Sequence, residues 1–191
     1  TRSMGGVGVG MRNAAAVNLL NPAAYSAVRP KSFLFDFGLE GQCFYNSQKY
    51  YGQTLNTSYY TVNFHDIAFQ LPIAKHLGLG FSLTPYSSVG YRMKQEVDDD
   101  EIWGNIGRVQ YQWDGDGDVT EVKLGLGWEI FRGFSIGIAA QYYWGDIQRI
   151  YKTAILENIT GGGLIADATG TETYSVSRFK GQFGVQWSPI S

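Results

Sequence analysis

The sequence contains few residues that could carry out catalysis. His65 precedes Asp66, and His76 is the second of the two histidines in the chain. A histidine held by a carboxylate can act as a general base, but this chemistry also needs a nucleophile. No nucleophile motif lies near either histidine. We therefore expect that the protein is not an enzyme.

Metal binding has equally little support. Two histidines and the single Cys43 cannot supply a typical zinc site, and a lone cysteine excludes an internal disulfide. The run Asp98–Glu101 could attract a divalent cation, although an exposed acidic loop needs no such role. The run Asp114–Asp118 mimics the start of a calcium loop, but Val119 stands where a glycine is required, and the final glutamate is missing. We expect no metal and no cofactor.

The composition favours a membrane protein built from strands. Of the 191 residues, 17% are charged, 15% are aromatic and 25 are glycine, whereas about a quarter of residues are charged in soluble domains. The mean hydropathy is −0.17, and no stretch approaches the roughly 18 apolar residues of a spanning helix. Strands with one apolar and one polar face give such averages. The net charge of −2, with scattered Lys and Arg, indicates no nucleic-acid partner.

The first 31 residues differ from the rest of the chain. Glycines are frequent in the first ten positions, with neither a preceding strand nor a following βαβ unit that would indicate a nucleotide site. Asn13 could cap a short helix over residues 14–20, and Asn21-Pro22 would end it, because the residue before proline avoids the α region. A helix this short is unstable alone in water. We therefore expect residues 1–31 to form a plug packed inside the remainder.

Residues 32–191 alternate between apolar and polar side chains, as membrane-spanning strands do. The first segment places Phe33, Phe35, Phe37, Leu39, Gly41, Cys43 and Tyr45 on one face. The same period recurs in residues 59–71, 77–84, 121–130, 134–144 and 178–187. The polar faces include seven residues that we expect in the lumen: Asp36, Glu40, Gln42, Lys123, Glu129, Arg178 and Lys180. They would either form a charge network on the plug or simply hydrate a polar interior.

The connections between these segments alternate in length. Short turns are expected at residues 72–76 and 132–133, and long polar connections at residues 46–58, 98–105 and 152–171. Residues 86–97 and 106–113 would pair as a hairpin that extends strands three and four outside the membrane, with a bulge or kink at residues 114–118. Short turns on one side and long loops on the other are typical of outer-membrane barrels.

About six strands cannot close a barrel, because the smallest such barrels have about eight. Open edges in lipid would leave backbone groups unsatisfied. We expect the missing strands to come from residues outside this sequence or from other chains, and we favour an incomplete chain. A soluble β-barrel binding protein is a further alternative, but it would require the Phe33–Phe37 face to be covered by protein.

With these segments in place, the chain resembles the long-chain fatty acid transporter family of outer-membrane proteins, the FadL-like barrels. The motifs are the glycine lead-in over residues 4–10, Asn21-Pro22-Ala23, and the runs over residues 77–88 and 123–137. The resemblance covers essentially the whole chain but only the N-terminal half of a family member, with members from Bacteroidetes-type bacteria the most similar. It implies an all-β, antiparallel transmembrane barrel of about fourteen strands with an N-terminal hatch.

The resemblance also implies functional positions. Asn21, Pro22 and Ala23 would be the hatch motif, and Pro85, Tyr86, Ser87 and Ser88 would form a strand-three kink through which an apolar ligand leaves sideways. Proline removes a ladder donor, so a break in strand pairing at Pro85 is physically reasonable. We expect the hatch motif to lie against the wall near this kink.

These expectations lead to two functions in the bacterial outer membrane. The first is passive uptake of hydrophobic compounds such as long-chain fatty acids, with lipid and a hydrophobic small molecule as partners. The alternative is a non-transporting accessory barrel subunit in an outer-membrane assembly or secretion complex, where the partners are other outer-membrane proteins. The sequence names neither the ligand nor these proteins.

Overall fold

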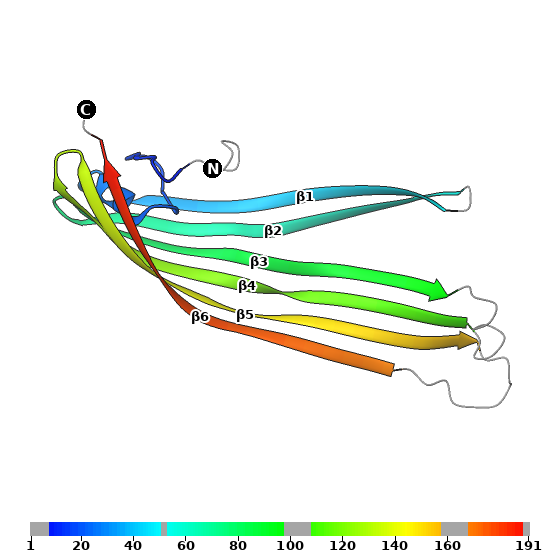
Figure 1. Ribbon diagram of the computed structural model, residues 1–191. Helices are drawn as coiled ribbons and strands as arrows, with labels where there is room; N and C mark the ends of the chain where they lie inside the picture. The colour runs from blue at the N-terminus through cyan, green and yellow to red at the C-terminus, as the bar shows by residue number, and fades with distance from the viewer. Residues whose placement is uncertain (1–7, 51–52, 98–107, 158–167, 189–191) are drawn as a thin grey trace. The chain divides into compact units, whose positions relative to one another are not determined.

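The chain forms one antiparallel sheet of six strands in sequence order (Figure 1). The computed structural model describes residues 8–50, 53–97, 108–157 and 168–188. The elements are η2 (Pro22–Ala27), β1 (Leu34–Tyr50), β2 (Gln53–Ala74), β3 (Leu77–Val97), β4 (Arg108–Phe131), β5 (Phe134–Glu157) and β6 (Ala168–Trp187). Among the described residues, no helix has the length and hydropathy needed to cross a membrane. The predicted all-β antiparallel fold is therefore confirmed as an open sheet with β1 and β6 at its edges.

The strand count and the two short turns are confirmed, but the strands are longer than expected. Residues 46–58 were expected to be a long connection, yet β1 and β2 stay paired up to Tyr50 and Gln53. Residues 152–157 and 168–171 are likewise strand, and the rest of that expected connection lies outside the described residues, as does the one at residues 98–105. Polar side chains do not stop a ladder, because the hydrogen bonds of a ladder are made by the backbone.

The structure divides into two compact units. The first contains Thr1–Pro85, Glu121–Tyr142 and Phe179–Ser191, and the second contains Tyr86–Thr120 and Tyr143–Arg178. The first unit holds η2, β1, β2 and one portion of each of the other strands, and the second holds the remaining portions. These units divide the strands along their length, so they do not test the expected boundary at residue 31.

The expected helix over residues 14–20 is wrong, and a 3-10 helix forms later, over Pro22–Ala27. The cause is Asn18, whose Nδ2 donates to the backbone oxygens of Gly8 (2.9 Å) and Met11 (2.7 Å). Its Oδ1 accepts from the backbone nitrogen of Leu20 at 2.9 Å. These bonds satisfy the backbone locally, in competition with the helical pattern.

Asn21-Pro22 starts a helix and does not end one. Asn21 is extended, with φ −130° and ψ 114°, and its Oδ1 accepts from the backbone nitrogen of Ala23 at 3.0 Å. Proline is favoured at the first helical position because its missing N–H has no partner there and its φ already suits the helix. The dipeptide thus caps the residues after it, and residues 14–20 before it form no helix that it could end.

In the first unit, the strands present an apolar face and a polar or glycine-rich face. On the apolar face, the exposed side chains include Phe35, Phe37, Leu39, Val62, Leu124, Leu126, Trp128, Ile138, Phe183 and Val185. On the other face, the buried residues include Ala68, Gln70, Ser82, Lys123, Ser135, Ala139 and Gln186. A bulge at His65 is visible in the register, where Gly38 pairs with Asp66 and Leu39 pairs with Phe64.

In the second unit, β4 runs through residues 114–118 as one strand, and the bulge or kink expected there stays a prediction. Gly117 in this stretch has φ +135°, and a Cβ there would overlap the backbone of Asp146 and Ile147. Asp114 accepts from Arg92 Nε at 3.1 Å and from Gln112 Nε2 at 2.6 Å. Its carboxylate is therefore engaged by neighbouring strand residues.

We predict that Gly117→Ala lowers the free energy of unfolding by about 2–4 kcal/mol, because it adds a Cβ at positive φ against the backbone of a neighbouring strand. Urea unfolding followed by tryptophan fluorescence measures the change. Gly90→Ala is the matched control, since a Cβ at Gly90 meets no atom within 4 Å. Equal effects of the two substitutions would contradict the explanation.

Candidate functional site

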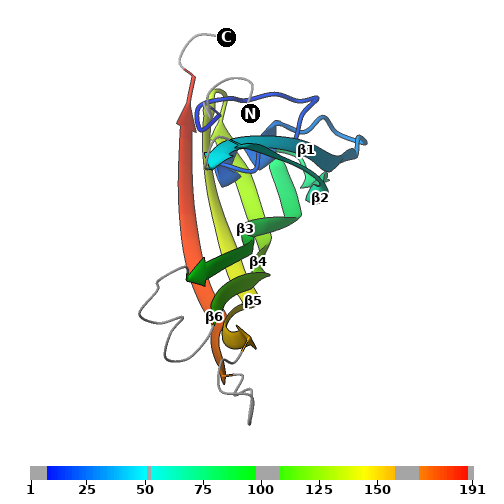
Figure 2. The ribbon, with the colours of Figure 1, turned by 90° about the vertical axis from the view of Figure 1, so that its right-hand side faces the viewer.

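The N-terminal segment, residues 8–28, packs directly against the glycine-rich face of the first unit (Figures 1 and 2). Six glycines form what we call the glycine floor: Gly78 and Gly80 on β3, Gly125 and Gly127 on β4, Gly137 on β5 and Gly184 on β6. A Cβ at any of them would overlap atoms of residues 21–26. The missing side chains therefore allow the backbone of η2 to lie on the backbone of the sheet.

Tyr25 is the central side chain of this contact. Its ring lies over Gly80 and Gly125, and its residue is 1% exposed. Burial, with a smaller contribution from the charge of Glu121, raises the pKa of Tyr25 to about 12. The phenol therefore stays neutral at physiological pH and adds no buried charge to the site.

Asn21 fixes the segment to the edge strand β6 as well as capping η2. Its Nδ2 donates to Val9 O at 2.9 Å and to Val185 O at 3.3 Å. Pro22 lies over Gly127 and Gly137, and Ala23 has no exposed surface. The expected hatch motif thus lies on β4, β5 and β6.

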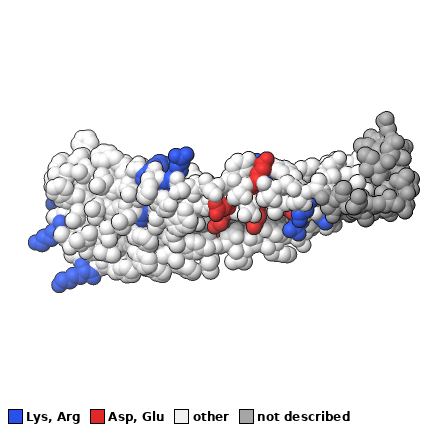
Figure 3. All heavy atoms as spheres, turned by 90° about the horizontal axis from the view of Figure 1, so that it is seen from below, with Lys and Arg blue, Asp and Glu red and all other residues white. Residues whose placement is uncertain are grey.

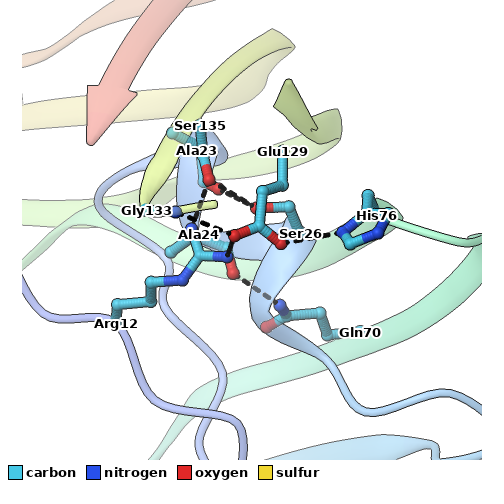
Figure 4. A network of polar contacts seen from close by, with 9 residues as sticks. All are labelled: Arg12, Ala23, Ala24, Ser26, Gln70, His76, Glu129, Gly133 and Ser135. Carbon is cyan, nitrogen blue, oxygen red and sulfur yellow. Dashed lines mark hydrogen bonds and ion pairs between the residues drawn. The ribbon is translucent and has the colours of Figure 1, made fainter. Parts of the chain in front are cut away.

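A polar network of partly buried and exposed side chains joins the segment to two turns of the sheet (Figure 4). Arg12 Nη2 lies 3.3 Å from Glu129 Oε1, and His76 Nδ1 lies 3.0 Å from Glu129 Oε2. The Gly133 backbone nitrogen also donates to Glu129 Oε1, at 3.3 Å. Because His76 is in the β2–β3 turn and Gly133 is in the β4–β5 turn, this one carboxylate connects both turns to the N-terminal segment.

Hydroxyl and amide groups extend the network across the sheet. Arg12 Nη1 donates to Ser135 Oγ, and Ser26 Oγ lies 3.1 Å from the same hydroxyl. Gln70 Nε2 on β2 donates to Ala24 O at 3.2 Å. Strands β2 and β5 therefore hold η2 through side chains that point from opposite sides of it (Figure 4).

The irregular stretch before η2 obtains its remaining partners from β4 and β6. Lys123 Nζ donates to Leu19 O at 2.6 Å and lies 3.8 Å from Glu121 Oε1. Gln182 Nε2 donates to Leu20 O at 2.6 Å, and Gln186 Nε2 donates to Val9 O at 3.2 Å. The segment has no helical ladder here, so these side chains supply bonds that its backbone carbonyls would otherwise lack.

The seven expected lumen residues divide into two groups. Lys123 and Glu129 contact the N-terminal segment directly. On β1, Gln42 donates to Glu40 at 2.9 Å, while Asp36, Arg178 and Lys180 are exposed. Two of the seven thus contact the N-terminal segment, and both the charge network and the location of all seven in a lumen stay predictions.

The expected strand-three kink lies where one ladder stops. Among the described residues, the pairs between β2 and β3 extend from Ala74–Leu77 to Ile67–Leu83, two residues before Pro85. β3 itself continues as strand through Pro85 to Val97. Tyr86, Ser87 and Ser88 are exposed and belong to the second unit, so their expected nearness to the hatch motif stays a prediction.

His65 and Asp66, the pair considered for general-base chemistry, lie on β2. His65 Nδ1 lies 2.8 Å from Asp66 Oδ1 beside the bulge in β2. Within the described part of the chain, no three His, Cys, Asp or Glu side chains gather as metal ligands. The sequence analysis missed Arg12, Ser26, Gln70 and Ser135. The glycine floor left a visible signal, since its glycines fall on one face of four alternating segments.

Comparison with known proteins gives one family. A model of the family described as BamG matches residues 1–190. No curated protein matches the chain, and no solved structure does. The resemblance to long-chain fatty acid transporters is therefore wrong as an assignment of family. The glycine lead-in and the Asn-Pro-Ala tripeptide are too short to separate two families that share alternating strands.

We predict that Gly137→Val displaces the N-terminal segment, because the added side chain overlaps Pro22 and Ala23. Trypsin should then cleave after Arg12 about tenfold faster, as expected for roughly 1.4 kcal/mol of overpacking. Gly181→Val on β6 is the control, since a Cβ there meets nothing within 4 Å. Similar cleavage rates in both variants would contradict the glycine floor.

We predict that Asn21→Ala lowers the free energy of unfolding by about 2–3 kcal/mol, since it removes a helix cap and two donated hydrogen bonds at a buried position. Urea unfolding tests this. Asn46→Ala, at an exposed position on β1, should change the free energy by less than about 0.5 kcal/mol. A loss that is no larger for Asn21→Ala would show that these bonds do not hold the segment.

Proposed function

The chain belongs to the BamG family, and from this premise we propose that it is an accessory subunit of an outer-membrane protein assembly complex. The family is associated with the outer-membrane assembly machinery, which favours this role over a channel for fatty acids. No catalytic step is assigned to the chain in this role. Its part is to place a stable β surface beside other outer-membrane proteins.

The first unit has the features of a barrel wall in lipid. Its apolar face exposes large side chains on several neighbouring strands, including Phe37 and Trp128, each 52% exposed. Soluble monomers rarely expose contiguous apolar patches of more than a few hundred Å². The strands run from 17 to 24 residues, longer than the roughly 9–11 that cross a bilayer. Figure 3 shows a face on which charged residues are few.

Strands supplied from beyond the described sheet would complete the wall. β1 and β6 are the edge strands of the sheet, and an edge within lipid would leave backbone groups without partners. The closing strands would come from further residues of the protein or from a neighbouring subunit. In such a barrel, the glycine floor would face the lumen, and residues 8–28 would be the plug.

The observation that carries the proposal is the fixed position of the N-terminal segment. A hatch that opens for a ligand must separate from the wall at low cost. Here η2 rests on glycine backbone, and its neighbours are held by Asn21, Lys123 and the Arg12–Glu129 pair. Releasing it would break these contacts, and each polar group of the wall that stayed buried without its partner would cost about 1–3 kcal/mol. These contacts support a plug that stays in place and a barrel with a structural role.

Affinity purification from solubilised native membranes tests the proposal. We expect the tagged chain to copurify with outer-membrane assembly proteins in near-stoichiometric amounts, measured by quantitative mass spectrometry. Loss of the chain should lower the amount of folded barrels in the membrane and leave the uptake of labelled fatty acid unchanged. A chain that purifies alone, together with reduced fatty acid uptake in its absence, would overturn the accessory role. An unrelated tagged outer-membrane barrel is the control.

A further inference from the structure

A recess lies where the N-terminal segment meets the β2–β3 turn in the first unit. Its volume is about 620 Å³, within the roughly 300–1,000 Å³ of ordinary ligand pockets. Residues 26–30 and 74–77 form much of its lining, together with Arg12 and Glu129. The plug segment and the turn therefore build it jointly, and it exists only while the segment is docked.

The charge of this recess is unbalanced. Arg12, Arg29 and Lys75 line it with His76, and Glu129 is the one carboxylate among its lining residues. Glu129 is already bound by Arg12, His76 and the backbone of Gly133. Arg29 and Lys75 are exposed, and neither forms an ion pair with a described residue. Two cationic groups therefore remain for a ligand with negative charge.

The position of the recess favours a partner in water over a lipid. Glu129 points to the face that carries the N-terminal segment, whereas the adjacent Trp128 and Ile130 expose their side chains on the apolar face. Side chains alternate between the two faces of a strand. Lipid would cover the apolar face, so its headgroups would not lie over the recess. An acidic segment of a partner protein could reach it from the aqueous side.

We propose that this recess is a docking site for an acidic peptide segment of a partner protein, whose carboxylates pair with Arg29 and Lys75. Arginine binds carboxylates through paired donors, and Lys75 adds a second positive charge to the lining of the recess. The proposal rests on the proposed function, because it names the chemistry by which an assembly partner would hold this subunit.

The test uses the purified full chain in detergent and fluorescein-labelled octaglutamate as the probe. We expect the wild-type chain to bind octaglutamate and not octalysine, and the variant Arg29→Glu with Lys75→Glu to bind at least about tenfold more weakly. Lys49→Glu with Lys94→Glu is the matched control, since both lysines are exposed and neither lines the recess. Circular dichroism confirms that all variants are folded.

Three results would overturn the docking site. They are an absence of octaglutamate binding to the wild-type chain, equal binding by the Arg29 and Lys75 variant, and equal weakening by the control. Vesicles of phosphatidylglycerol form a separate arm, and binding to them alone through Arg29 and Lys75 would identify a lipid headgroup site and reject the peptide.

Failure of this inference and failure of the proposed function give different results. If the wild-type chain copurifies with assembly proteins and the Arg29 and Lys75 variant copurifies equally well, only the docking site is wrong. If octaglutamate binds through Arg29 and Lys75 while the chain copurifies with no assembly protein, the recess binds acidic peptides and the accessory role is wrong.

Discussion

The structure depends on the close approach of two backbones. Residues 21–26 lie on the glycine floor so closely that a single Cβ at Gly78, Gly127 or Gly137 would occupy the same space as the chain of η2. Glycine weakens a strand because it contributes no side chain and loses more entropy on folding. The sheet accepts this cost at six positions, and the contact with the N-terminal segment offsets it. Neither part has a complete core by itself.

The close approach also explains why so many side chains around the floor are polar. A segment without a regular helix or strand carries backbone groups that must find partners when they are buried. Asn18 and Asn21 supply partners from within the segment, and Lys123, Gln182 and Gln186 supply them from the sheet. The polar side chains around the glycine floor thus serve as partners for the irregular backbone of the N-terminal segment.

The alternation of apolar and polar side chains was enough to predict six strands and the turns at His76 and Gly133. This pattern can be read from neighbouring residues alone, because it repeats every two residues. The alternation could not predict where the helix forms. Asn18 keeps residues 14–20 from being helical through hydrogen bonds to residues seven and ten positions away. Glu129 was placed on the polar face correctly. Arg12 and Ser135 are bonded although they lie 123 positions apart in the sequence, and a local pattern cannot predict a contact over such a separation. The family could not be read from short motifs, because alternating strands repeat the same residue types in unrelated families.

The span of these contacts has a consequence for the order of folding. Asn21 bonds to Val185 across 164 positions, and Gln186 bonds to Met11 across 175. Met11 and Asn21 therefore make these contacts only after β6 has joined the sheet, and contacts between such distant residues form slowly. The N-terminal segment can therefore complete its contacts only when β6, the last described strand, is paired in register.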